Sequence, residues 1–258
     1  MESIDIPNSV TEIGGWAFFR CYSLRSIDIP KSVKTIGNQA FGHTSIKKIF
    51  IPLSVNSIKE HALCHCKLSA IEVDKDNPIY YSQDDVLYKR INVNNNVLIK
   101  YPPQKCDNSF SVNESTTMLD SCAFKDAEEL SEITLHNGIS SLGDQHTFAG
   151  CSSLKRMELP TSITEIPQEA FYSCLSLEEV SLPNSEHYFI GKRVFGNCPS
   201  LRSIHSVAQN PDGIMIDDNA FDGFSIDECT LYIPSGTRWA YRHHPGFGKF
   251  KNIEIEKK

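Results

Sequence analysis

The sequence has no excess of basic residues and no long apolar run. Its 258 residues carry 25 lysines and arginines against 32 aspartates and glutamates, a formal net charge of −7. The lysines and arginines are not clustered in a basic stripe, which argues against binding to the phosphate backbone of nucleic acids. No run approaches the ~18 apolar residues of a membrane-spanning helix. The sequence therefore predicts a protein that neither binds nucleic acid nor spans a membrane.

Motifs of catalysis and export are also missing. The sequence contains no nucleophile elbow, no phosphate-binding loop and no metalloprotease helix motif. Residues 1–5 lack the basic patch and the apolar segment of a signal peptide. We therefore expect no enzyme activity and no cofactor. Either the protein stays in the cytoplasm or its export signal lies outside this sequence.

What the sequence does contain is a repeat. The octapeptide Ser-Ile-Asp-Ile-Pro-Asn-Ser-Val at residues 3–10 returns, with changes, at 26–33, 48–55 and 156–163. Steps of 23, 22, 22, 39, 23, 24 and 23 residues separate the last apolar residues of successive expected strands, which are Ile6, Ile29, Ile51, Val73, Val112, Leu135, Leu159 and Leu182. All steps but one lie within the period of about 20–29 residues that is typical of leucine-rich repeats.

Each repeat has the same internal order. An alternating strand ends at a proline, and a short apolar pair, a small residue with an aromatic, and often a Cys and a Leu follow. A single unit cannot bury these apolar residues, whereas stacked units bury them in continuous ladders. The pattern predicts a β-rich α/β solenoid of about ten coils of 22–24 residues. Helix should be limited to short turns, such as one at residues 169–172.

The repeat resembles that of the BspA-like leucine-rich repeat family. Residues 24–41 and 154–171 match the family motif Leu-x-x-Ile-x-Ile-Pro-x-Ser-Val-x-x-Ile-Gly-x-x-Ala-Phe most closely, with Pro167 in place of the glycine in the second. The resemblance covers nearly the whole chain. It implies a bacterial cell-surface or secreted protein that binds host or neighbouring-cell components, and it brings no catalytic residues.

Two segments depart from the repeat. The 39-residue step contains two expected strands, 86–91 and 96–101, around an asparagine-rich turn, which predicts a β-hairpin insert at about 74–108. Residues 231–258 restart a strand and then end in large aromatics and charges, as a C-terminal cap would. We therefore expect a solenoid over 1–230 and a capping segment over 231–258. Since the first strand begins at the start of the sequence, other sequence is expected to cap that end.

The candidate metal ligands are interpreted as structural. Nine cysteines cannot all pair, and five of them recur at one repeat position, where stacked buried thiols are expected: Cys21, Cys66, Cys151, Cys174 and Cys198. The run from His61 to Cys66 is rich in His and Cys, but its side chains should diverge, so we predict no zinc site. The aspartates at 74–85 lack the spacing of a calcium loop and are interpreted as turns.

The remaining candidate is the outward row of the strands. Parallel pairing should place these residues side by side on one surface: Asp5, Asp28, Phe50, Glu72, Thr134, Glu158, Ser181 and His205. The row is mostly acidic and small, which favours a basic or polar partner. The leading hypothesis is a non-catalytic interaction or adhesion module for a protein. The alternatives are cell-surface carbohydrate binding, with Tyr80, Tyr81 and Tyr88 as the local aromatics, and a structural spacer.

Overall fold

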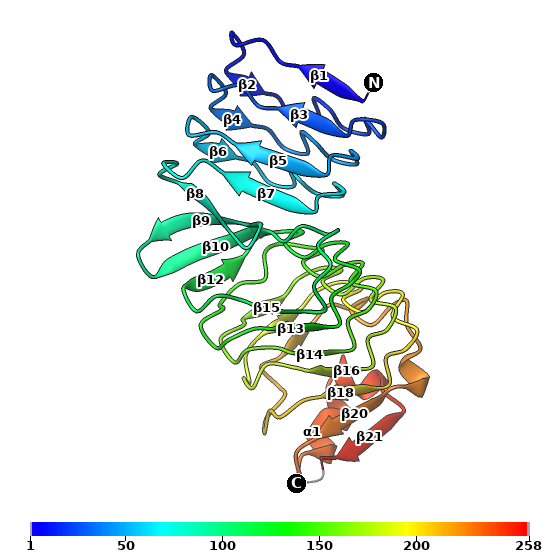
Figure 1. Cartoon of the computed structure of the whole chain (residues 1–258). Coiled ribbons are helices and arrows are strands. Elements are labelled where there is room, and N and C mark those ends of the chain that lie inside the picture. Colours follow the sequence, from blue (N-terminus) through cyan, green and yellow to red (C-terminus); the bar gives the residue numbers. More distant parts are fainter. Residues whose placement is uncertain (1, 257–258) are drawn as a thin grey trace.

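The computed structural model describes residues 2–256 as an elongated, curved stack of coils with the two ends of the chain far apart (Figure 1). It is a β-solenoid of about 11 turns with almost no helix. The predicted fold class is therefore confirmed. No helix among the described residues is long and apolar enough to cross a membrane.

The longer strands of successive coils form one side of the solenoid, which we call the strand face. Most of its neighbouring strands pair in parallel, in four separate sheets. The strands of this face are β1 (Ser3–Asp5), β3 (Ser26–Asp28), β5 (Lys48–Ile51), β7 (Ala70–Val73), β11 (Ser109–Ser111), β13 (Glu132–Thr134), β14 (Arg156–Glu158), β16 (Glu179–Ser181), β18 (Ser203–His205), β20 (Thr230–Ile233) and β21 (Asn252–Ile255).

A second set of short strands forms another side of the coils. They correspond to the short apolar pair that follows the proline in each repeat, and they also pair in parallel. These strands are β2 (Glu12–Ile13), β4 (Thr35–Ile36), β6 (Ser57–Ile58), β15 (Glu165–Ile166), β17 (Phe189–Ile190) and β19 (Met215–Ile216).

The aromatic of each repeat lies in the core between the two sets of strands. Phe124, Phe148, Phe171 and Phe195 are fully buried and stack in succession, with ring centroids 5.1–5.7 Å apart. The helical turn expected at 169–172 is wrong, because Glu169 has a φ of 54° and adopts left-handed backbone. An α-helix of L-residues cannot pass through that conformation, so this corner of the coil is a turn.

The insert is a small sheet and not only a hairpin. Its strands are β8 (Tyr80–Gln83), β9 (Val86–Asn92) and β10 (Asn95–Lys100), and β12 (Thr116–Leu119) of the following coil joins the same sheet. The antiparallel β9–β10 hairpin was predicted, whereas β8 was not. Asp84 and Asp85, with φ of 51° and 65°, join β8 to β9 as a two-residue loop, and positive φ at both positions is what a type I′ turn requires. Because β10 also pairs in parallel with β12, the insert is built into the stack.

The C-terminal end is closed by aromatic side chains and a last strand. Tyr241, Phe247 and Phe250 are fully buried, and β21 pairs in parallel with β20. Trp239 does not help to cover the core, since it is 74% exposed. The helical segments here are one short α-helix and two single 3₁₀ turns: α1 (Arg238–His243), η1 (Ile226–Glu228) and η2 (Phe247–Lys249).

Candidate functional site

The outward residues of the strand face form two ladders. Asp5 lies opposite Asp28, and Phe50 lies opposite Glu72. In the C-terminal half, Glu158, Ser181 and His205 occupy matching positions on β14, β16 and β18. The expected side-by-side arrangement is therefore present within each half. β7 and β11 belong to separate sheets, and the Ile71 amide of β7 donates to Asp85 O in the β8–β9 loop, so the eight residues do not form one unbroken row.

Sequence reasoning missed three members of these ladders. Ser111 lies opposite Thr134, and Tyr232 and Glu254 extend the second ladder onto β20 and β21. The restart of the strand at Leu231 was the signal that could have placed Tyr232. Nothing comparable marked Glu254, because β21 lies outside the repeat pattern.

The histidine in the middle of the second ladder is held in place. The ring of His205 stacks on that of Tyr232, with centroids 4.8 Å apart. Its Nδ1 lies 2.8 Å from Glu256 Oε2, and its Nε2 lies 3.8 Å from Glu179 Oε1. This part of the strand face is therefore a rigid polar surface with carboxylates on both sides of an imidazole.

The acidic members of the ladders are exposed and unneutralised. Asp5, Asp28, Glu72 and Glu158 are all exposed, and no ion pair within residues 2–256 involves any of them. Asp5 and Asp28 face each other across adjacent strands, an arrangement of like charges that is destabilising. Beside these carboxylates, Phe50 exposes 47% of its surface. The strand face therefore presents uncompensated negative charge with one apolar contact point.

The tyrosines of the insert do not provide a platform for a sugar ring. Tyr80 and Tyr88 are each only 2% exposed, and the Tyr80 hydroxyl accepts a hydrogen bond from the Ile58 amide. Tyr81 stacks on Tyr88 and carries the Arg90 guanidinium over its ring. The three rings therefore pack within the insert. The local aromatics expected for carbohydrate binding have no free face on which a sugar could stack.

Four of the five repeated cysteines are buried thiols as expected, whereas Cys21, in the first coil, is only half-buried. The Sγ atoms of Cys66, Cys151, Cys174 and Cys198 donate to backbone carbonyls of phenylalanines in the preceding coil, at 3.0–3.3 Å. Burial raises the pKa of Cys66, Cys151 and Cys198 to about 12. These thiols therefore stay protonated and act as small apolar groups.

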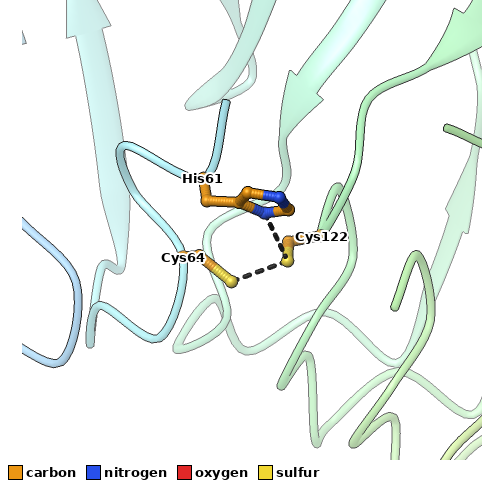
Figure 2. A group of neighbouring side chains, drawn as sticks. All are labelled: His61, Cys64 and Cys122. Atoms are coloured by element: carbon orange, nitrogen blue, oxygen red, sulfur yellow. Dashed lines mark hydrogen bonds between the residues drawn. The ribbon is translucent and has the colours of Figure 1, made fainter. Parts of the chain in front are cut away.

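The expectation that the side chains of residues 61–66 diverge is wrong for two of them. His61 and Cys64 turn toward Cys122, a residue of the coil that follows the insert (Figure 2). The two sulfurs lie 2.7 Å apart, and His61 Nδ1 lies 3.3 Å from Cys122 Sγ. Cys66 points into the thiol ladder as expected. Sequence reasoning could not find this group, because Cys122 is 61 residues from His61 and 58 residues from Cys64 and lies beyond the insert.

The sequence matches the model of the BspA type leucine-rich repeat region, in six copies over residues 1–95 and 104–227. No curated protein matches the chain. Among solved structures, the chain is similar over its whole length to a leucine-rich cell surface protein of Faecalibacterium prausnitzii, with 26% identity and a TM-score of 0.78. It spans 60% of the length of that protein.

Two further solved structures share the fold. The pneumococcal vaccine antigen PcpA is 23% identical, with a TM-score of 0.79, over all of this chain and 68% of its own length. A leucine-rich repeat protein of Eubacterium ventriosum is 20% identical, with a TM-score of 0.64, over 87% of this chain and 83% of its own. At these identities the likeness shows the architecture alone.

Proposed function

Because the chain belongs to the BspA-type leucine-rich repeat family, we propose that it is a non-catalytic module that binds a protein partner through the strand face. Solenoids use extended surfaces of this kind for binding. The observation that carries the proposal is the exposed set Asp5, Asp28, Glu72 and Glu158, whose like charges no base within residues 2–256 neutralises. A partner with basic side chains would relieve this repulsion and would therefore gain affinity.

Adhesion at the cell surface is the setting that we propose for this binding. It is supported by the similarity to the cell surface protein of F. prausnitzii. The partner would then be a protein exposed on a host or neighbouring cell. A glycan partner has less support, because Tyr80 and Tyr88 are buried. The chain spans only 60% of the F. prausnitzii protein. The proposal therefore concerns binding through the strand face and not the role of a longer protein.

The proposal predicts charge-dependent binding to a basic protein. The whole chain would be screened on a protein array and on a glycan array, and each saturable hit would be titrated at two salt concentrations. We expect a protein hit whose affinity falls as salt rises. Changing both Asp28 and Glu158 to lysine should raise the dissociation constant for this protein by about tenfold or more.

The matched control changes both Glu12 and Glu165 to lysine, which makes the same charge change at exposed positions on the short strands β2 and β15, outside the strand face. It should leave the affinity unchanged. Equal weakening by the control would overturn the strand face as the binding surface. Hits on the glycan array alone would favour carbohydrate binding, and silence on both arrays would favour the spacer.

A further inference from the structure

The coil that contains the insert lacks the turn that follows the aromatic residue in the other coils, which we call the corner. In regular coils, the amide two residues after the aromatic donates to the next coil, as Arg20 N does to Gly42 O and Asp126 N to Ala149 O, both at 2.8 Å. Tyr101 takes the place of the aromatic, and its amide donates to Ala123 O. The residue two positions later is Pro103, which has no N–H to donate. One inter-coil hydrogen bond is therefore missing here.

A lysine side chain replaces the missing donor. Lys100, only 2% exposed, extends its Nζ to the carbonyl oxygens of Lys125 and Cys122, at 2.9 Å each. The Lys125 carbonyl is the one that the amide of residue 103 would otherwise reach. With the corner absent, the loops before and after the insert coil meet directly. His65 Nδ1 lies 3.0 Å from Asp126 Oδ2 across this junction.

Cys64 and Cys122 face each other within the same junction (Figure 2). They are 6% and 3% exposed, and their Sγ atoms are 2.7 Å apart. Sulfurs in a disulfide are about 2.05 Å apart, whereas two sulfurs on a tetrahedral zinc ion, each ~2.3 Å from the metal, would be ~3.8 Å apart. The observed spacing is closer to that of the bonded pair. The neighbouring Lys100 side chain also opposes a divalent cation.

The electrostatics make the two sulfurs unequal. The hydrogen bond with Cys122 lowers the pKa of Cys64, and His61 and the charge of Lys100 lower it further. The same contact, together with burial, raises the pKa of Cys122. These surroundings therefore favour the thiolate at Cys64 over the thiolate at Cys122. Thiolates, and not thiols, are the reactive form of cysteine.

Small molecules have a route to these sulfurs. A hollow of about 210 Å³ lies over them, and Cys64, Cys122, His43, His65, Lys125 and His146 are among the residues that line it. It is large enough for hydrogen peroxide or another small hydroperoxide. The polar and basic lining favours a negatively charged sulfur over a neutral one.

We propose that Cys64 and Cys122 form a site that small hydroperoxides oxidise to a disulfide across the insert. The Cys64 thiolate attacks one peroxide oxygen, so an S–O bond forms and the O–O bond breaks. The departing alkoxide or hydroxide takes a proton from water. Cys122 then attacks the sulfur of the Cys64 sulfenic acid, expelling hydroxide, which leaves as water with the Cys122 proton. His61 Nδ1, 3.3 Å from Cys122 Sγ, is placed to carry that proton.

The balance of this reaction is complete. Counting the proton that Cys64 gives to water when it ionises, two thiols and one hydroperoxide give one disulfide, one water and one alcohol; hydrogen peroxide gives a second water in place of the alcohol. The two sulfurs lose two electrons, which the O–O bond takes up. The product joins the coil before the insert to the coil after it, so we expect the melting temperature of the oxidised chain to be higher than that of the reduced chain.

The test uses the whole chain, fully reduced and then treated with hydrogen peroxide under native conditions. We expect it to lose two of its nine thiols, to yield one cross-linked peptide pair containing Cys64 and Cys122, and to regain all thiols with dithiothreitol. Cys106→Ser, which removes an exposed thiol, should leave the cross-link intact. His61→Gln should slow its formation by about tenfold or more.

Three outcomes would overturn the proposal. One is a cross-link between other cysteines. A second is that the peroxide-treated chain without substitutions loses thiols but forms no cross-link. This outcome does not depend on whether any variant folds. The third is tight, stoichiometric binding of added zinc that Cys122→Ser abolishes, because the group would then be a metal site. In contrast, trapping of a Cys64 sulfenic acid by dimedone in Cys122→Ser would support the first step.

Discussion

We expect Phe171→Ala to lower the free energy of unfolding by about 3–5 kcal/mol. The Phe171 ring is fully buried, and its centroid lies 5.1 Å from that of Phe148 and 5.7 Å from that of Phe195. Truncation removes the packing on both faces at once and leaves a cavity between coils. Because each coil is stabilised by its neighbours, the loss is felt by the whole C-terminal stack. Urea denaturation followed by circular dichroism would measure it.

The matched control is Phe18→Ala. Phe18 occupies the same repeat position in the first coil, is only half-buried and stacks on a single ring, that of Phe41 at 5.7 Å. Truncating Phe18 should lower the free energy of unfolding by clearly less than truncating Phe171. Equal losses from the two variants would mean that stacking from both sides is not what stabilises the ladder.

The phenylalanine ladder could be predicted because it follows from repetition alone. A small residue and an aromatic recur after each strand, and any stack of identical coils places such residues above one another. The same reasoning placed Cys151 and Cys174 in the buried thiol ladder and Glu158 opposite Ser181 on the strand face. Features that every coil shares are therefore readable from one sequence.

Contacts across the insert could not be predicted, because they depend on how one coil differs from the rest. Cys122 stands where other coils carry residues such as His61 or Glu169, so its repeat position gave no sign of a thiol partner. It meets Cys64 beside the position where Pro103 has no amide to donate and Lys100 donates in its place. Such a substitution of one donor by another leaves no periodic signal. The hydrogen bonds of Lys100 had to be seen in three dimensions.

The insert is anchored by a buried asparagine in the loop before β8. Asn77 is 3% exposed, and its Nδ2 donates to the carbonyls of Pro52 and Val55 at 2.9 and 3.0 Å. Its Oδ1 accepts from the amides of Ile79 and Tyr80 at 3.0 and 2.8 Å. In regular coils a serine hydroxyl makes the matching contact to the preceding coil, as Ser32 does to Val10 O. Asn77 thus continues the serine ladder and also fixes the start of β8.

Asn77→Ala is therefore expected to lower the free energy of unfolding by about 2–4 kcal/mol, because the Val55 carbonyl and two amides lose this partner, and the Pro52 carbonyl keeps only the Val55 amide. Asn77→Asp has the same size and keeps the acceptor, but it loses both donors and places a negative charge beside two carbonyl oxygens. At neutral pH it should be at least as destabilising as the alanine variant. Asn92→Ala removes an exposed asparagine whose Oδ1 accepts only the Asn94 amide, and it should change stability by no more than about 0.5 kcal/mol. If Asn77→Asp unfolded at the wild-type urea concentration, the two donated hydrogen bonds would contribute nothing. The insert would then be held to the solenoid by its apolar packing alone.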